Sequence, residues 1–430
     1  MAEAGKRACV IGAGIVGLNC ALWLRREGFD VTVIDRDQEG DRASHGNAGA
    51  IAVAEVLPLP EPGIARKVPG YLFDPLGPLS IRFSYLPWLW PYLRNFLAVA
   101  QPENYRAGAK AMAELLASAL TDHDDVLAET GLSHLIARRG GLFVYRSEQA
   151  RVAAQEGWAI RRELGLTAEP LDRAGIQALE PALGPGAQCG YYTEDWAHYR
   201  DPKELCDGVL DYLRRAGVEI IAAEVTDFEM KSGRPSAAIT ARESRHAFDH
   251  LVIAAGAWSH KLSARFGDFF PLETERGYNT TISEPGIDVG IMTSFAEDHF
   301  VMTPMAMGLR IGGAAEFAGL GAAPDYRRCK ALLSLAKRYL PDLKTEGGRQ
   351  WMGHRPSTPD SLPVIGPSAR FANVWYAFGH GHLGLTGSAT TGRVIASLVT
   401  GRRPNVDLRP FRITRFNADD EAPGNGVMRA

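Results

Sequence analysis

Apolar and polar positions near the start of the chain alternate in a strand–turn–helix–strand order. The apolar run Ala8–Ile11 predicts a buried strand, and the stretch that begins at Ile15 predicts a helix. A second apolar run, Val31–Asp35, predicts a strand that ends in an acid. The first 55 or so residues therefore predict a βαβ unit followed by a glycine-containing loop.

The turn between the first strand and the helix has the spacing of a dinucleotide-binding loop. Gly12, Gly14 and Gly17 form G-x-G-x-x-G, and Asp35 follows eighteen positions after Gly17. Gly12 permits the tight turn, Gly14 lets backbone N–H groups approach a pyrophosphate, and Gly17 lets the helix pack on the sheet. The helix N-terminus attracts phosphates, and Asp35 can accept hydrogen bonds from ribose. An ordinary strand–turn–helix explains this combination less well.

The remaining elements follow from the same patterns. A helix over Asp201–Ala216 has Asp201 as its N-cap and Pro202 in its first turn. Further helices are predicted at Ala107–Leu120, Ala150–Leu164, Arg327–Leu340 and Ser388–Val399, and strands at Gly141–Tyr145, Val218–Ala222, His250–Ala255, Tyr278–Ile282, Phe300–Thr303, Leu309–Gly313 and Trp375–Phe378.

These patterns predict an α/β protein with two interleaved domains, because nucleotide-type patterns occur in three separated pieces. One domain is Rossmann-like, discontinuous and of the glutathione-reductase type. The other is an α+β substrate domain with a mainly antiparallel sheet. The expected division assigns residues 1–58, 198–266 and 351–430, including a C-terminal tail, to the Rossmann-like domain, and residues 59–197 and 267–350 to the substrate domain.

Composition narrows the class of protein. The chain has 430 residues, 46% of them hydrophobic, with a formal net charge of −3 and no Lys/Arg cluster, which argues against a nucleic-acid partner. The five cysteines are scattered without C-x-x-C spacing, so we expect no metal site, no disulfide framework and a cytoplasmic setting. We expect no signal peptide, because the first apolar run carries the glycine loop.

The most membrane-like stretch is Tyr85–Leu97. It is too short to cross a bilayer and contains two prolines and an arginine. We interpret it as an amphipathic helix that closes one domain. A peripheral contact with the inner membrane is the alternative.

Three later segments carry candidate chemistry. Small residues in Ser44–Ala50 leave a bare backbone against which a flat ring system can lie. A glycine-rich turn, Phe378–Ser388, leads into a helix whose N-terminal dipole can favour a reduced, anionic flavin. We interpret His380 and His382 as residues that shape this turn, rather than as catalytic residues, and hold this more firmly for His380.

The segment Trp351–Gly366 places Arg355 on a proline-stiffened stretch at a predicted domain junction. A guanidinium there can bind a carboxylate through two parallel hydrogen bonds. It can equally form an interdomain ion pair, for example with Asp360. The residues alone do not choose between the two.

These stretches, in this order, resemble the D-amino-acid oxidase/glycine oxidase family of flavoproteins, and most resemble its bacterial FAD-dependent D-amino-acid dehydrogenases. The resemblance extends from Val10 to about Phe416. Its most specific parts are S-x-x-N-A-G from Ser44, W-x-G-x-R-P-x-x-P-D from Trp351, and G-H-G-H-L-G-L-T-G from Gly379. A-A-G-A-W from Ala254 and R-G-Y from Arg276 are also similar.

The resemblance implies FAD bound in extended form, and it favours Arg355 as the anchor of the substrate carboxylate. Tyr278 lies where relatives often place a tyrosine that faces the substrate. The cofactor-binding residues it implies are Gly12, Gly14, Ile15, Val16, Gly17, Asp35, Arg36, Ser44, Asn47, Ala48, Gly49, Val225, Ala255, Gly256, Trp258, Gly381, His382, Leu383, Gly384, Leu385 and Thr386.

Two departures from relatives stand out. The acid after the second strand is often glutamate in relatives, and aspartate at position 35 is chemically adequate. Related sarcosine oxidases bind flavin through a cysteine in the W-x-G segment, whereas this chain has no cysteine after Cys329. We therefore expect non-covalent FAD.

The implied reaction is oxidation of a D-amino acid to an imino acid by hydride transfer to the flavin, with electrons passed to a quinone or carrier. The expected substrate is small and apolar or cyclic, of the D-proline or hydroxy-D-proline type, in a pocket built around Tyr71–Tyr92 and Phe300–Met307. The alternatives are an oxidase of glycine, sarcosine or other N-alkyl amino acids that uses oxygen, and a flavin-bearing subunit of a larger complex. A plain NAD dehydrogenase would leave the C-terminal glycine turn without a role. We assign no catalytic base, and the oligomeric state stays open.

Overall fold

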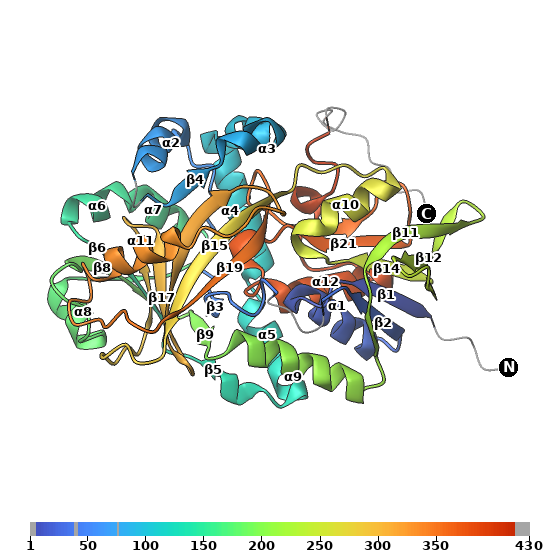
Figure 1. Cartoon of the computed structure of the whole chain (residues 1–430), viewed down its shortest axis with the longest axis horizontal. Helices are drawn as coiled ribbons and strands as arrows, with labels where there is room; N and C mark the ends of the chain where they lie inside the picture. Colours follow the sequence, from blue (N-terminus) through green and yellow to red (C-terminus); the bar gives the residue numbers. More distant parts are fainter. Residues whose placement is uncertain (1–5, 38–41, 75–76, 418–430) are drawn as a thin grey trace.

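The computed structural model describes residues 6–37, 42–74 and 77–417, so the part of the predicted C-terminal tail beyond residue 417 lies outside it. Most strands belong to one of two sheets that lie side by side (Figure 1). One sheet is mainly parallel and the other mainly antiparallel, which confirms the predicted fold class.

The parallel sheet is assembled from three separate stretches of the chain. Its strand order is β10 (Glu219–Ala222), β2 (Asp30–Asp35), β1 (Arg7–Ile11), β14 (His250–Ile253), β21 (Val374–Phe378) and β20 (Val364–Pro367). Only β20 runs antiparallel to its neighbour. Helix α1 (Ile15–Arg26) packs between α9 (Pro202–Arg215) and α12 (Ser388–Val399). Sequence-distant segments thus complete the predicted βαβ unit.

Side chains of β1 alternate between two cores. Ala8 and Val10 belong to the cluster that includes α1 and α12, whereas Cys9 and Ile11 belong to a cluster on the other face. The second face is covered by the strands β11 (Val225–Lys231), β12 (Arg234–Thr240) and β13 (Arg245–Ala247) and by α10 (Ser259–Ser263). Coverage on both faces explains why this strand is a continuous apolar run in the sequence.

The second sheet forms the other half of the molecule. Its order is β19 (Arg349–Ser357), β15 (Glu273–Ile282), β18 (Gly308–Phe317), β17 (Phe300–Met305), β16 (Met292–Phe295), β6 (Gly141–Tyr145), β8 (Cys189–Thr193) and β7 (Glu169–Leu171), and β4 (Leu79–Ile81) pairs with β18. Its pairs are antiparallel apart from β6–β16 and β4–β18. Helices α8 (Arg173–Leu179) and α11 (Arg327–Ala336) pack against it.

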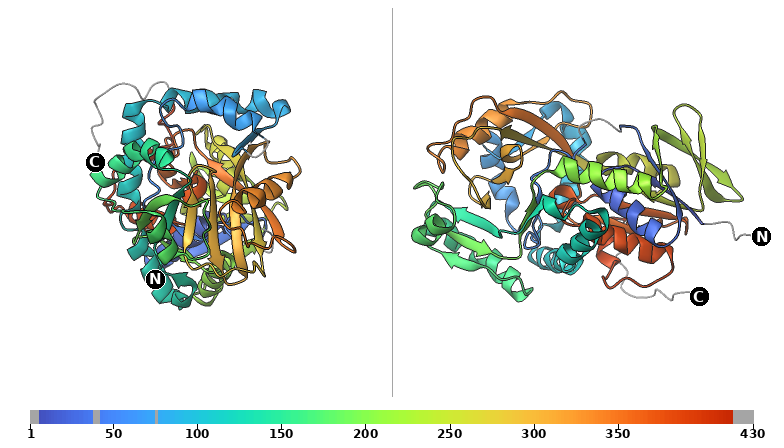
Figure 2. Two further views of the ribbon diagram at one scale, coloured as in Figure 1. Left: turned by 90° about the vertical axis from the view of Figure 1, so that its left-hand side faces the viewer. Right: turned by 90° about the horizontal axis from the view of Figure 1, so that it is seen from below.

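Six further helices of the described chain lie in the stretch between β3 (Ala50–Ile51) and β7. These are α2 (Ile64–Phe73), α3 (Leu86–Val99), α4 (Pro102–Leu116), α5 (Ala119–Thr130), α6 (Glu148–Ala153) and α7 (Gln155–Glu163). Of these, α5 packs against α12 and α9, and α6 packs against β6 and β8. Figures 1 and 2 show α2 and α3 together at one side of the large sheet, beside β4. A small sheet of β3, β9 (Ala197–Tyr199) and β5 (Ile136–Ala137) ties the halves together.

Two predicted helices are each broken in two. The helix predicted over Ala107–Leu120 divides between α4 and α5, and the one over Ala150–Leu164 divides between α6 and α7. At the first break, Ser118 donates its hydroxyl hydrogen bond to Asp122 (2.9 Å) in the new helix. The predicted N-cap at Asp201 is confirmed, because its Oδ1 accepts the backbone N–H groups of Lys203 (2.8 Å) and Glu204 (3.1 Å).

The stretch Tyr85–Leu97 forms most of α3, as predicted. Within the described ranges, no helix has the length and apolar character needed to cross a membrane.

Candidate active site

The first loop has glycines where backbone segments come too close for a side chain. A Cβ on Gly12 would lie 2.3 Å from the carbonyl oxygen of Ala254, and the residue has φ of 107°. A Cβ on Gly17 would lie 1.9 Å from the Gly12 carbonyl oxygen. Gly12 therefore permits β1 to approach β14, and Gly17 permits α1 to pack against the loop, as its spacing predicts.

The acid at the end of β2 is already bonded to this loop. Asp35 Oδ2 accepts the backbone N–H of Ala13 (2.6 Å), and Oδ1 accepts that of Asp37 (2.9 Å). The Arg36 guanidinium lies 3.9 Å from the ring centre of Trp258, on the turn after β14. Asp35, Arg36 and Trp258 thus form one end of a cavity between the two halves.

The loop after β2 is shaped by its own polar side chains. Ser44 Oγ accepts the backbone N–H of Ile15 (2.9 Å), at the first turn of α1. Asn47 Nδ2 donates to the Ser44 carbonyl (2.8 Å), and its Oδ1 accepts the N–H of Gly49 (2.7 Å). These side chains hold the loop beside the α1 N-terminus and leave the backbone around Ala48 to line the cavity.

The position of Trp351 explains why residues 46 and 353, within the Ser44 and Trp351 motifs, are glycine. Its indole lies against Gly46 and Gly353, where an added Cβ would be 2.2 Å and 2.0 Å from ring carbons. Arg310 also supports the loop, because its Nη1 donates to the Asn47 carbonyl (2.6 Å). Trp351, Gly46 and Arg310 were not predicted from the sequence as site residues. A charged residue within the apolar strand β18 was the available signal for Arg310.

The C-terminal glycine turn closes the cavity from the other side. Thr386 Oγ1 donates to the Ala50 carbonyl (3.1 Å) and accepts the N–H of Ala52 (3.1 Å), which fastens the turn to β3. His380 Nε2 is hydrogen-bonded to Thr391 Oγ1 (2.9 Å), and burial lowers its pKa to about 3. This contact is the turn-shaping role predicted for His380.

His382 has a different setting. Its side chain is open to the cavity, although it lies deep in the protein, and this depth lowers its pKa. Residues 381–386 line the cavity, whereas α12 begins only at Ser388, whose side chain is buried. The 381–386 turn therefore lies between the N-terminus of α12 and the cavity, and the helix dipole acts on the cavity across this turn.

The cavity has a volume of about 1430 Å³ and extends from the first glycine loop to Arg355. Of the residues predicted to bind cofactor, only Gly17 and Gly49 are absent from its described lining. Gly17 packs against Gly12, and Gly49, with φ of 70°, faces the Tyr199 carbonyl. The two residues shape the backbone of the site without lining it.

Arg355 projects into this cavity from β19, directly opposite Glu275 on β15. Its Nη1 donates to Glu275 Oε1 (2.6 Å) and to the Ala314 carbonyl (3.0 Å), and its Nη2 is 3.5 Å from the Gly313 carbonyl. A guanidinium has five N–H donors. Within the described residues, Nε and the second Nη2 hydrogen have no protein acceptor, so this edge of Arg355 is available to a ligand.

The suggested ion-pair partner of Arg355 was wrong. Asp360 binds Arg415 through two hydrogen bonds (2.7 and 3.0 Å), and Glu275 takes its place beside Arg355. Glu275 was not predicted from the sequence, because only the strand register places it opposite Arg355.

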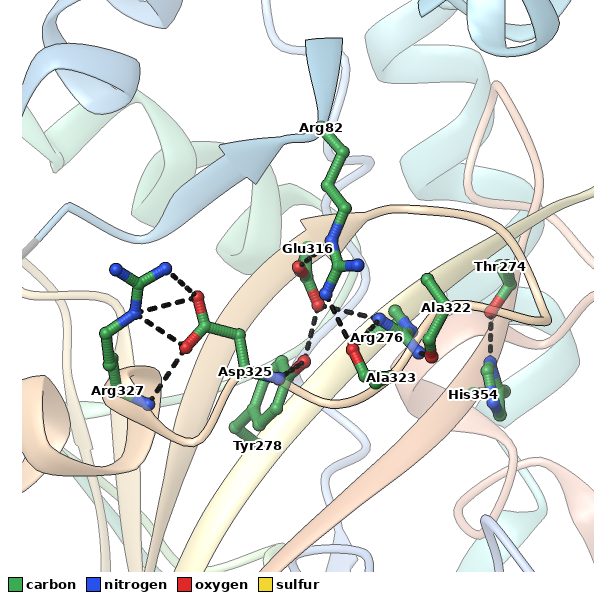
Figure 3. Close-up of polar contacts among 10 residues, drawn as sticks. All are labelled: Arg82, Thr274, Arg276, Tyr278, Glu316, Ala322, Ala323, Asp325, Arg327 and His354. Carbon is green, nitrogen blue, oxygen red and sulfur yellow. Dashed lines mark hydrogen bonds and ion pairs between the residues drawn. The ribbon is translucent and has the colours of Figure 1, made fainter. Parts of the chain in front are cut away.

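Tyr278 is among the residues that line the cavity, but its hydroxyl is bonded within a buried polar cluster, an arrangement that does not favour the substrate-facing role predicted for it. Its hydroxyl donates to Glu316 and accepts the backbone N–H of Asp325 (3.0 Å), as Figure 3 shows. Side chains alternate along a strand, so Tyr278 shares a face with Arg276 and lies opposite to the face of Glu275. Tyr278 is three residues from Glu275 on β15, an odd number, so the two side chains point to opposite faces of the sheet.

The polar cluster around Tyr278 is structural. Arg276 has no exposed side-chain area, and its Nη1 donates to Glu316 (3.0 Å) and to the Ala323 carbonyl (3.3 Å). Arg82, just before α3, donates to Glu316 (3.0 Å) and to Ala323 (2.6 Å). The cluster fastens the segment between β4 and α3 to the large sheet (Figure 3).

Apolar residues of α2 and α3 form part of the cavity lining. Leu86, Trp90, Leu93 and Leu97 follow one another at helical spacing on α3 and line the cavity. Trp90 is 59% exposed, which places it at the rim. From the predicted pocket segments, Tyr71, Leu72, Tyr92, Phe300 and Val301 are among the lining residues.

The site fits the predicted dinucleotide cofactor. Gly12 and Gly14 provide bare backbone, the first turn of α1 borders the same space, and Asp35 keeps further acceptor capacity at the far end. The 44–50 loop and residues 381–386 would hold the ring system. Cys329 donates to the Asn279 carbonyl (3.3 Å) and is buried outside the lining.

Comparisons with known proteins agree with this geometry. The family model "DAO: FAD dependent oxidoreductase" matches residues 7–398. The chain is 39% identical to a D-amino-acid oxidase of Bradyrhizobium diazoefficiens over 96% of this chain and 99% of that protein. It is 28% identical to a D-amino acid dehydrogenase of Granulibacter bethesdensis over 95% and 99% of the respective chains.

Solved structures show the same fold. Glycine oxidase from Geobacillus kaustophilus superimposes with a TM-score of 0.74 at 20% identity, covering 95% of this chain and 98% of that one. L-proline dehydrogenase from P. horikoshii gives a TM-score of 0.72 at 17% identity, with 96% and 98% covered.

Proposed function

The chain belongs to the DAO family of FAD-dependent oxidoreductases, and we propose that it oxidises D-amino acids to imino acids. The names of its relatives support an amino acid as substrate, since proteins similar over almost the whole chain are a D-amino-acid oxidase and a D-amino acid dehydrogenase. When bound, FAD supplies the hydride acceptor. The protein then has to bind the amino acid, orient it and keep water away.

The observation that carries this proposal is the available edge of Arg355. Its Nε and Nη2 can form two parallel hydrogen bonds with a carboxylate, the geometry that fixes both position and orientation of an α-carboxylate. The guanidinium is held on its other edge by Glu275 and Ala314, so it is rigid before substrate arrives. Arg355 is therefore the proposed carboxylate anchor.

The apolar walls of the cavity favour a substrate with an apolar side chain. Phe143, Trp158, Trp196 and Phe300 line the cavity together with apolar residues of α2 and α3. Such walls gain free energy when apolar surface is removed from water, and they provide few partners for a charged side chain. We retain small apolar and cyclic D-amino acids as the first candidates.

We propose a quinone, or another apolar carrier, as electron acceptor. The support is the apolar lining from α2 and α3 and the exposed aromatic residues in and just before α3. Phe83, just before α3, and Trp88, on α3, are 86% and 74% exposed, and Trp90 on the same helix lines the cavity. Aromatic residues of this kind are typical of contacts with a membrane interface or with an apolar partner. Oxygen is the competing acceptor, since one relative is named an oxidase.

Anaerobic mixing of the purified flavoprotein with a panel of D-, L- and N-alkyl amino acids tests the proposal. We expect bleaching of the flavin absorbance by D-amino acids. Slow reoxidation in air and fast reoxidation by a soluble quinone would support the dehydrogenase. Fast reoxidation with peroxide formation would support the oxidase. Bleaching only by glycine or sarcosine, or by no amino acid, would overturn the proposal.

A further inference from the structure

The ion pair between Glu275 and Arg355 is set in the cavity wall and not at the protein surface. The two residues face each other across β15 and β19, and the side chain of Glu275 is only 9% exposed, that of Arg355 28%. Both line the cavity. A buried pair of this kind contributes little net stability, because desolvation of the two charges offsets their attraction. The contribution of this ion pair to folding stability therefore does not explain why residue 275 is an acid.

Glu275 retains free acceptor capacity. Its Oε1 accepts from Arg355 (2.6 Å), and its Oε2 accepts a long hydrogen bond from the Ser357 hydroxyl (3.4 Å). An ionised carboxylate offers about four acceptor sites. Glu275 can therefore accept further N–H donors while it holds Arg355.

The charges near Glu275 leave this part of the cavity dipolar and without net charge. Arg355 supplies the cation, and burial lowers the pKa of His382, which lines the same cavity, and so favours its neutral form. Of the other acids around it, Glu55 lines the same cavity and is paired with Arg161 (3.2 Å). Glu273, two residues away on β15, accepts a hydrogen bond from the Tyr85 hydroxyl outside the lining. Such a site complements a zwitterion. It repels a second carboxylate, and an amine without a carboxylate leaves Arg355 without its ligand.

We propose that Glu275 binds the α-ammonium group of the substrate while the available edge of Arg355 binds its carboxylate. This inference rests on the proposed amino-acid oxidation and adds how the site recognises its substrate. The two charges of the substrate meet the two charges of one ion pair, which orients the Cα between them. The enzyme then selects zwitterionic α-amino acids over 2-hydroxy acids and simple carboxylic acids of the same shape.

The test compares Glu275→Gln with wild type, using the best D-amino acid of the panel and the carboxylic acid that has the same side chain but no amine. Glutamine preserves an acceptor for Arg355 and removes the charge. We expect the apparent KM of the amino acid to rise about 10- to 100-fold, since a hydrogen bond to a charged group is lost. The Kd of the carboxylic acid, read from its perturbation of the flavin spectrum, should stay equal or fall.

Glu273→Gln is the matched control, because Glu273 lies on the same face of β15, is also buried, and binds Tyr85 outside the cavity. It should leave the ratio of the two affinities unchanged, and Glu275→Asp should restore part of the amino-acid affinity. A parallel weakening of both ligands by Glu275→Gln would overturn the proposal, since it would mean that Glu275 acts only by holding Arg355.

Wild-type protein provides a test that does not depend on folding of a variant. The carboxylic acid without an amine should bind at least about tenfold more weakly than the amino acid. Equal binding of the two would overturn the role of Glu275 and leave amino-acid oxidation intact. If no amino acid reduces the flavin in wild type, the proposed function itself fails.

Discussion

The guanidinium of Arg355 lies directly against the Cα of Gly277. A Cβ on Gly277 would be 2.3 Å from Arg355 Nη2 and 2.4 Å from Cζ. Gly277 is paired with Gly353 on the neighbouring strand; Gly277 leaves room for the Arg355 guanidinium, and Gly353 leaves room for the Trp351 indole. The R-G-Y and W-x-G-x-R motifs thus describe one structural unit, although some 75 residues separate them in the chain.

Gly277→Ala should therefore displace Arg355. We expect FAD to be retained and the apparent KM of the amino acid to rise at least about tenfold, because the carboxylate anchor loses its position. Steady-state kinetics and the flavin spectrum measure both effects. Gly70→Ala in α2, where an added Cβ meets no atom within 4 Å, is the control. Unchanged kinetics in Gly277→Ala would show that Arg355 does not bind substrate in this conformation.

Replacing the anchor itself should have a larger effect. Arg355→Leu should keep FAD and raise the apparent KM by orders of magnitude, since a bidentate charge-assisted contact contributes roughly 2–4 kcal/mol. Arg355→Lys should recover only part of the loss, because an ammonium group cannot reproduce two parallel hydrogen bonds. Wild-type kinetics in the leucine variant would place the carboxylate anchor elsewhere.

The contact between Gly46 and Trp351 should control cofactor retention. Gly46→Ala puts a methyl group where the indole lies, 2.2 Å from Cε2, and should displace the loop that lines the ring end of the cavity. We expect a lower ratio of flavin to protein after purification. The double variant with Trp351→Leu should recover part of this ratio. Equal flavin content in wild type and Gly46→Ala would contradict this account.

Tyr278→Phe should change stability rather than catalysis. The substitution removes the hydroxyl between Glu316 and the Asp325 N–H (Figure 3) and should lower the free energy of unfolding by about 1–3 kcal/mol. Urea denaturation measures this loss, and the apparent KM should stay within about twofold. A raised KM at unchanged stability would restore the substrate-facing role.

Acid should destabilise the protein through buried neutral histidines. Burial lowers the pKa of His198 to about 4, below its usual value near 6.5. The unfolded chain binds this proton first, so stability is full above about pH 6.5 and falls as the pH drops towards 4. The slope is up to about 1.4 kcal/mol per pH unit for each such group. His198→Gln should flatten the decline of Tm between pH 7 and 5. Parallel curves of Tm against pH for wild type and variant would contradict this prediction.

Local patterns were sufficient for the parts of the fold that depend on short-range order. The glycine loop, the Asp201 N-cap and the bounds of β6 and α12 could all be predicted, because turn geometry, capping and hydrophobic periodicity act over a few residues. The breaks between α4 and α5 and between α6 and α7 could not. Helix breaks without proline or glycine depend on what the helices pack against.

The sequence by itself determined the class of cofactor site, and its resemblance to a known family pointed to Arg355, which lines the cavity. Only the tertiary structure decided which acid accompanies Arg355 and which way Tyr278 points. Both depend on the register and the facing of β15 against β19, since a shift of one residue in a strand moves every side chain to the opposite face. Neither property is encoded in the local pattern of either strand, because it arises only when the two strands, distant in the chain, pair.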